Sequence, residues 1–160
     1  MNTQTQNAYF GAGCFWGVEE YFRTLPGVIE TEVGYMGGHT DNPTYETVCG
    51  GTTGHAETVH IVFNLDVLSF ADLCRKFFAI HNPTTVNRQG HDIGEQYRSV
   101  IFYVDGSQQD VAEKVKQEID EGGTYQKPVV TEIVPAYTFW RAEEYHQQYA
   151  LKHGGASCHI

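Results

Sequence analysis

Apolar residues recur at helical spacing in four segments of the chain and gather into short runs in five others. The spacing of three to four residues predicts helices over 16–24, 69–80, 107–121 and 142–152. The short runs, some alternating and some rich in β-branched residues, predict strands near 8–12 and over 28–35, 57–63, 99–104 and 128–134. Strands and helices therefore alternate along most of the chain.

Small polar residues mark where the two central helices begin. Ser69, with Asp72 three residues later, is expected to cap the helix over 69–80. Ser107 is expected to cap the helix over 107–121, and the Gly122-Gly123 pair is expected to end it. Both segments therefore read as separate amphipathic helices.

Two stretches, 37–55 and 84–97, fit neither pattern. They are polar and rich in glycine, proline and asparagine, which favour turns. The first is too long for an ordinary connection between elements, so we expect it to be a functional loop. Together with the second stretch and the C-terminal tail, it is what remains to build a site.

The order of elements favours a two-layer α/β (α+β) sandwich in which helices pack on a mixed β-sheet. We predict a ferredoxin-like core with long active-site loops and an irregular C-terminal tail. Because no internal repeat or linker interrupts the pattern, we expect a single catalytic domain over 1–160. Within it, 1–7 is expected to be a disordered arm and 153–160 a mobile tail.

The composition excludes several classes of partner. Ten Lys and Arg residues face twenty Asp and Glu residues, so the net charge of −10 argues against nucleic acid and anionic membranes. No apolar run approaches the roughly 20 residues of a membrane span. The first seven residues do not resemble a signal peptide, so we expect a cytoplasmic protein whose four cysteines are thiols.

Cys14 is the most conspicuous candidate for chemistry. It falls where the first predicted strand meets the first predicted helix, and amide groups at a helix start stabilise a thiolate. Gly13 and Gly17 would allow close approach, and Phe15 and Trp16 would form an aromatic wall beside the sulfur. A buried cysteine without a chemical role fits this stretch equally well.

Four further residues in the loops carry groups that could donate protons or hydrogen bonds. Tyr45 lies in the first loop, Glu57 at the start of a strand, and Asp92 and Tyr97 in the second loop. Two phenols and a protonated carboxyl suit protonation of an oxygen, provided that an apolar pocket keeps the carboxyl neutral. Taken singly, each of the four could equally be a core, turn or surface residue.

Six ordered blocks of the sequence resemble the A-type peptide-methionine sulfoxide reductases, and they extend over nearly the whole chain. The blocks are Gly13-Cys14-Phe15-Trp16-Gly17, Gly34-Tyr35-Met36-Gly37-Gly38, Asn42-Pro43-Thr44-Tyr45 with Val48-Cys49, Gly54-His55-Ala56-Glu57, 88–99, and His146-Gln147-Gln148-Tyr149. One short motif would be weak support, whereas six in the family's order are specific.

The resemblance implies reduction of methionine S-sulfoxide, free or in peptides and oxidised proteins. Cys14 would be the thiolate that attacks the sulfoxide sulfur, leaving a sulfenic acid. Glu57 would protonate the sulfoxide oxygen, helped by the hydroxyls of Tyr45 and Tyr97.

The resemblance also assigns the substrate contacts and the reductant. Phe15 and Trp16 would hold the methyl group on sulfur, and Asp92 would anchor the substrate through the same hydrogen-bond network. No cofactor or metal is implied, and thioredoxin would supply the electrons.

The remaining cysteines leave one choice open. By the resemblance, Cys158 in the tail would form a disulfide with Cys14 that thioredoxin reduces directly, because the chain lacks the second tail cysteine of many family members. Cys49 is a rival for that role. Cys74 falls on the apolar face of a predicted helix and is expected to be structural.

Three other functions fit the sequence less well. A cysteine hydrolase would pair Cys14 with His146 or His153, but it gives the tail cysteine no role. A metal site could draw on His153, Cys158 and His159, but the spacing of common metal motifs is missing. A peptide-binding module would use the aromatic wall without turnover.

Overall fold

The computed structural model describes residues 4–153, and its centre is a six-stranded sheet. The strands are β1 (Thr5–Ala12), β2 (Val28–Met36), β3 (Ala56–Asn64), β6 (Ser99–Tyr103), β7 (Glu132–Pro135) and β8 (Trp140–Arg141). Their order across the sheet is β7-β6-β1-β3-β2-β8. The β6–β7 pair is parallel and the other pairs are antiparallel, so the sheet is mixed.

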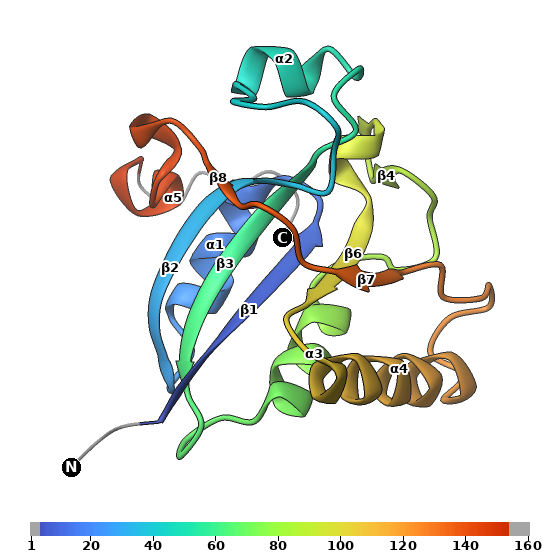
Figure 1. Ribbon diagram of the computed structural model, residues 1–160. Coiled ribbons are helices and arrows are strands. Elements are labelled where there is room, and N and C mark those ends of the chain that lie inside the picture. The colour runs from blue at the N-terminus through green and yellow to red at the C-terminus, as the bar shows by residue number, and fades with distance from the viewer. Residues whose placement is uncertain (1–3, 154–160) are drawn as a thin grey trace.

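Three longer helices cover the sheet. They are α1 (Phe15–Arg23), α3 (Phe70–Ala79) and α4 (Gly106–Glu121). In Figure 1, α1 and α3 lie behind the sheet and α4 flanks α3, while the segment that carries β8 crosses in front. The order β6-β1-β3-β2 with helices on one face is the ferredoxin-like arrangement, which confirms the predicted fold class.

Phenylalanine side chains fill the layer between sheet and helices. The ring of Phe10 on β1 stacks against Phe22 of α1 at 5.5 Å between ring centroids. It also stacks against Phe70 and Phe77 of α3, at 6.1 and 5.0 Å. Because one β1 side chain contacts both helices, the layer forms a single core and holds α1 against the sheet.

The two long loops contain short elements that the sequence did not predict. The first loop holds α2 (Tyr45–Cys49), and the second holds β4 (Arg88–Gln89), β5 (Asp92–Ile93) and the 3₁₀ turn η1 (Glu95–Tyr97). Five residues give too little periodicity to identify a helix such as α2. In Figure 1, α2 lies beyond the ends of β2 and β3, above the sheet.

The predicted start of β1 and the predicted cap of α4 were wrong. Strand β1 begins at Thr5, so it includes part of the segment expected to be an arm. Helix α4 is capped by Asp105, whose carboxylate accepts the N–H of Gln108, and not by Ser107. Asp105, two residues before Ser107, satisfies a free amide at the helix start, so the helix begins earlier and Ser107 is its second residue.

The predicted helix over 142–152 is instead broken in two. A 3₁₀ turn, η2 (Glu144–His146), is followed by α5 (Tyr149–Lys152). Between them Gln148 adopts a left-handed backbone conformation with φ of 54°, which a continuous helix cannot contain. The side chain of Gln147 bonds both backbone groups of Val33 on β2, so the break serves to dock this segment.

No helix within residues 4–153 is long and apolar enough to cross a membrane.

Candidate active site

Cys14 occupies the turn between β1 and α1, where the sequence placed it. It is the N-cap residue of α1, and the preceding Gly13 has φ of 97°, a conformation that favours glycine. The Cys14 side chain is 7% exposed. The turn therefore holds the sulfur just below the surface, at the start of a helix.

Glu57 lies directly beside that turn. It is the second residue of β3, it is 1% exposed, and its Oε1 accepts the backbone N–H of Phe15 at 3.1 Å. Within residues 4–153, its Oε2 is buried without a hydrogen-bond partner. Burial, with a smaller contribution from the negative charge of Asp92, raises the pKa of Glu57 to about 8. The carboxyl is therefore protonated at neutral pH.

The two predicted phenols approach the same carboxyl from different loops. Tyr45 is the first residue of α2, and Tyr97 is the last residue of η1. Burial, followed by the charge of Glu57, raises the pKa of Tyr97 to about 12. Burial also raises the pKa of Tyr45, as do the charges of Cys49 and Glu57. Both hydroxyls therefore keep their protons and can donate hydrogen bonds.

Cys49 joins these two tyrosines. It is the exposed last residue of α2. Partial burial raises the pKa of its thiol, while the neighbouring hydroxyls of Tyr45 and Tyr97 act in the opposite direction. Asp92 on β5 is the other candidate residue from the second loop. Its charge acts on both Glu57 and Tyr97, so it belongs to the same cluster.

Trp16 forms the aromatic wall, and its ring is held on two sides. Its indole N–H donates to Nδ1 of His146 at 2.9 Å. Its ring stacks on Tyr149 with centroids 3.8 Å apart and an angle of 9° between the planes. Tyr45 is the third aromatic neighbour, at 6.3 Å. Trp16 is only partly buried, so it can face a ligand.

Phe15 contributes less open surface than Trp16. It is 1% exposed, and its ring packs against Tyr35 at 5.7 Å and His146 at 5.3 Å. Its backbone N–H, which binds Glu57, is a second contribution that the sequence did not predict.

His146 is a member of the cluster whose position the sequence did not predict. It is fully buried, and because its Nδ1 accepts from Trp16, its proton resides on Nε2. Burial lowers the pKa of His146, which favours this neutral form. Within the described chain, Nε2 is buried without a partner. The sequence identified 146–149 as one of the family blocks. It predicted a continuous helix there, however, and not the break that brings His146 to Trp16.

The C-terminal segment is fixed to the body by neighbouring residues of this block. Gln147 bonds the backbone of Val33, as described above. The N–H of Gln148 donates to Oε1 of Glu19 at 2.7 Å, and Thr31 donates to Oε2 of the same carboxylate at 2.9 Å. Glu19 is 1% exposed and lies on α1, one turn after Cys14. Helix α1 therefore carries both the cysteine and the anchor for the segment that holds Trp16.

Two cysteines lie away from the α1 turn, and they differ in exposure: Cys49 is exposed and Cys74 is buried. Cys49 and Cys74 both carry free thiols. Cys74 is fully buried on α3, and burial raises its pKa to about 12, so its thiol stays protonated in the core as expected. Cys158, the predicted partner of Cys14, lies outside the described residues.

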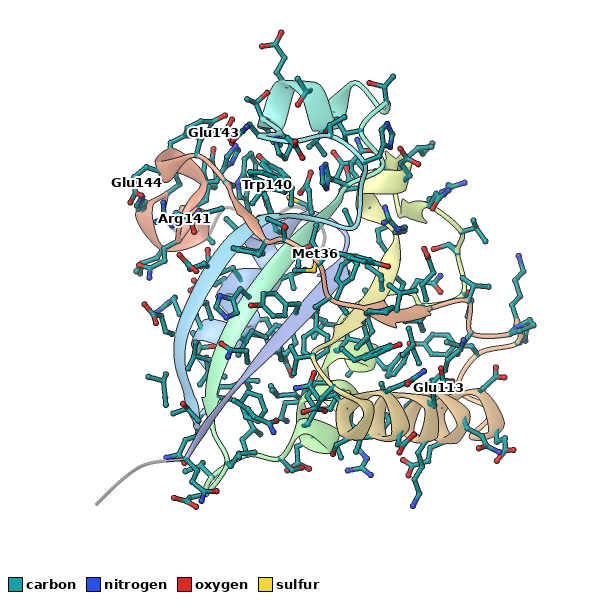
Figure 2. All side chains as sticks on the ribbon, viewed as in Figure 1. Met36, Glu113, Trp140, Arg141, Glu143 and Glu144 are labelled. Carbon is teal, nitrogen blue, oxygen red and sulfur yellow. The ribbon has the colours of Figure 1, made fainter. Side chains whose placement is uncertain are left out.

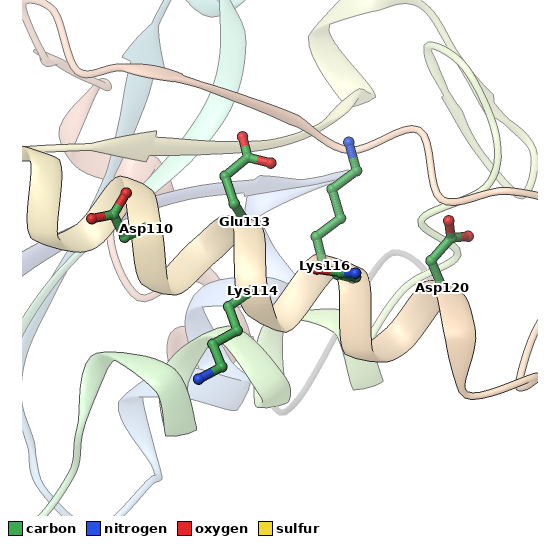
Figure 3. A pocket seen from close by; sticks show the side chains of 6 residues that line it. Asp110, Glu113, Lys114, Lys116 and Asp120 are labelled. Carbon is green, nitrogen blue, oxygen red and sulfur yellow. The ribbon is translucent and has the colours of Figure 1, made fainter.

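Hollows elsewhere on the molecule lack this chemistry. One hollow of about 460 Å³ lies over α4 and is lined by charged side chains that include Asp110, Glu113 and Lys114 (Figure 3). Within 4–153, no group of three or more His, Cys, Asp or Glu side chains could hold a metal ion. The convergence of Cys14, Glu57 and the two phenols is therefore the strongest candidate for an active site in this part of the chain.

Comparison with known sequences gives a consistent result over the whole chain. A family model described as peptide methionine sulfoxide reductase matches residues 6–160. The chain is 56% identical over 153 residues to peptide methionine sulfoxide reductase MsrA of Methanoculleus marisnigri, covering 96% of this chain and 93% of that protein. It is 54% identical over 157 residues to MsrA of Geobacter sulfurreducens, covering 98% and 97%.

Solved structures agree with the fold. Reduced Mxr1 from Saccharomyces cerevisiae matches with a TM-score of 0.90 and 34% identity, covering 98% of this chain and 92% of that one. Methionine sulfoxide reductase A of Corynebacterium diphtheriae matches with a TM-score of 0.85 and 37% identity, covering 96% and 77%.

Proposed function

This chain belongs to the peptide methionine sulfoxide reductase family, in its A-type branch, and we propose that Cys14 is the thiolate with which it reduces methionine S-sulfoxide. The substrate would be free or part of a peptide or oxidised protein. We further propose that residues 1–160 act as one catalytic domain.

In the first step the sulfur of Cys14 attacks the sulfur of the sulfoxide. The S–O bond breaks as the oxygen passes to Cys14, so that one thiol and one sulfoxide become one cysteine sulfenic acid and one methionine. The sulfoxide oxygen leaves its sulfur readily only after it is protonated, so the step needs an acid at that oxygen.

Glu57 is the proposed acid, and the observation that carries the proposal is its buried Oε2 beside the Cys14 turn, which has no hydrogen-bond partner among residues 4–153. The N–H of Phe15 occupies Oε1, which leaves Oε2 as the atom that can hold and deliver a proton. With a pKa of about 8, the carboxyl holds that proton at neutral pH but can still release it.

Tyr45 and Tyr97 would donate hydrogen bonds to the same oxygen. Their hydroxyls stay protonated because burial raises both pKa values, so each remains a donor as charge develops. Asp92, from the neighbouring strand β5, would hold the substrate within this network.

Trp16 would form the slot for the methyl group on sulfur. The stacking on Tyr149 and the bond to His146 fix the plane of its ring. Phe15 would line the inner side of the slot, since little of its surface is open. A fixed apolar slot would orient the sulfoxide so that one epimer presents its oxygen to Glu57.

Regeneration requires a second thiol and an external dithiol. The sulfenic acid of Cys14 would condense with the thiol of Cys158, releasing water and forming a disulfide. A thioredoxin would then reduce that disulfide by thiol–disulfide exchange, with no further cofactor. In support, yeast Mxr1, 34% identical in the comparison above, has also been solved in complex with Trx2. Cys49 remains the alternative resolving residue.

The test is reduction of each methionine sulfoxide epimer by the wild type and by Cys14→Ser, with dithiothreitol as reductant. The wild type should release methionine from the S epimer, and Cys14→Ser should release none. Residual turnover above a few per cent in Cys14→Ser would overturn the assignment of the nucleophile. A peptide-binding module would instead bind substrate in a fixed ratio and never consume it.

A further inference from the structure

Glu143 contacts Tyr45, one of the site residues, through the backbone of Tyr45. It lies two residues after the end of β8 and is the N-cap residue of η2. Its Oε1 accepts the hydroxyl of Tyr35 at 2.9 Å, and its Oε2 accepts the backbone N–H of Tyr45 at 2.9 Å. Figure 2 labels Glu143 on the C-terminal segment, on the side of the molecule where α2 lies. One carboxylate thus joins three parts of the chain: β2, α2 and η2.

The framework behind Glu143 is firm. Trp140 and Arg141 pair with β2, and the N–H of Ala142 donates to the carbonyl of Val33 at 2.9 Å. Tyr35, the other partner of the carboxylate, is fully buried on β2. Glu143 therefore approaches α2 from a rigid sheet edge.

Helix α2, by contrast, needs external support. It has five residues, and a helix of that length is not stable in isolation. The N–H that Glu143 binds belongs to Tyr45, the first residue of α2, where a helix leaves amides unsatisfied and favours negative charge. Partial burial raises the pKa of Glu143, but the hydrogen bonds outweigh it and the net pKa is lowered, so the group is a carboxylate at neutral pH.

We propose that Glu143 is a positioning residue that holds Tyr45 at the site by fastening the first amide of α2 to the sheet. The inference rests on the proposed role of the Tyr45 hydroxyl as a donor to the sulfoxide oxygen. Glu143 itself touches neither the substrate nor the sulfur of Cys14 in this scheme.

A double-mutant cycle in single-turnover reduction of methionine S-sulfoxide tests the proposal. Glu143→Ala should slow methionine release about ten- to a hundredfold, the rate equivalent of one hydrogen bond to a charged group. In a Tyr45→Phe background, which lacks the hydroxyl to be positioned, the same change should cost less than about twofold. Equal losses in both backgrounds would overturn the proposal, because they would mean that Glu143 does not act through Tyr45.

Two matched variants separate positioning from general damage. Glu144→Gln changes the neighbouring exposed carboxylate, which pairs with Arg141, and should leave the rate unchanged. Glu143→Gln keeps an oxygen acceptor but removes the charge, so it should fall between wild type and Glu143→Ala. A Glu143→Gln rate equal to wild type, with Glu143→Ala unfolded, would also overturn the proposal.

Hydrogen exchange gives a readout that does not depend on activity. The amide of Tyr45 should lose protection in Glu143→Ala and keep it in Tyr35→Phe, which removes the other partner of the carboxylate. Unchanged exchange at Tyr45 in Glu143→Ala would overturn the proposal. Failure of the proposed function would look different, because the wild type itself would then not reduce the sulfoxide.

Discussion

The backbone N–H of Phe15 donates to Oε1 of Glu57 at 3.1 Å, and this bond joins the residue after the nucleophile to the proposed acid. Phe15 is the first residue of α1, so its amide is one of those that would otherwise stabilise a Cys14 thiolate. The helix start thus serves the carboxyl as well as the thiol, and the two reactive groups are positioned by the same turn.

Replacing Glu57 by Gln should slow the chemical step. The amide can still donate a hydrogen bond but has no proton to give, so single-turnover release of methionine should fall about a hundred- to ten-thousandfold. In the wild type, the rate should decline as pH rises through about 8, where Glu57 loses its proton. That decline should be absent from the Glu57→Gln profile. A full-rate variant would transfer the role of acid to Tyr45 and Tyr97.

The same carboxyl should make stability depend on pH. Its pKa is raised from 4.5 to about 8 on folding, so between these values the folded state binds more protons than the unfolded state. The free energy of unfolding should therefore fall as pH rises from about 4.5 to 8, by up to a few kcal/mol, and Glu57→Gln should remove this slope. Urea unfolding at several pH values, in a constant redox buffer, measures the effect.

Glu113→Gln is the matched control for that experiment, because it makes the same Glu-to-Gln change on the exposed face of α4. Its pH dependence should match that of wild type. If Glu57→Gln and Glu113→Gln have equal slopes, the folded-state pKa of Glu57 is not raised.

Glu19→Ala should destabilise the protein and loosen the aromatic wall. The change removes the acceptor of the buried Thr31 hydroxyl and of the part-buried N–H of Gln148, at a cost of about 2–4 kcal/mol. Urea unfolding gives the stability, and tryptophan fluorescence reports the Trp16–Tyr149 stack. Glu20→Ala, which removes a partly exposed ion pair with Arg23, should cost under about 1 kcal/mol.

Cys158→Ser should separate the two halves of the cycle. One equivalent of methionine should still form, because the first step uses Cys14 alone, but recycling by thioredoxin should stop. Cys49→Ser is the matched comparison and should recycle normally. Normal turnover by Cys158→Ser together with loss in Cys49→Ser would make Cys49 the resolving residue.

Much of this arrangement could be predicted from the sequence, because local signals and global fold agree in the core. The capping box of Ser69 and Asp72 is present as expected. Glu57 acts electrostatically with Tyr45, Tyr97 and Asp92, and it contacts the turn that carries Cys14 through the N–H of Phe15. Glu57 begins the predicted strand over 57–63, whose strong alternation identified it, and the structure has this strand as β3 (Ala56–Asn64).

The contacts that support the site were harder to predict. Glu143 bonds one backbone amide that lies 98 positions earlier in the chain. Every residue except proline has such an amide, so the residue type at that position does not indicate the contact. Gln147 and Gln148 look like helix residues, yet their bonds to Val33 and Glu19 hold a broken helix in place. Tertiary contacts outweighed helix propensity there.

Strand β1 has a practical consequence for handling the protein. It leads from Thr5 at one end of the sheet to Ala12 at the other, two residues before Cys14. Eight residues of strand span roughly 25 Å, and Figure 1 shows the Thr5 end of β1 on the opposite side of the molecule from α2. A tag or surface tether joined ahead of Thr5 should therefore leave the entrance to the site open to large oxidised proteins.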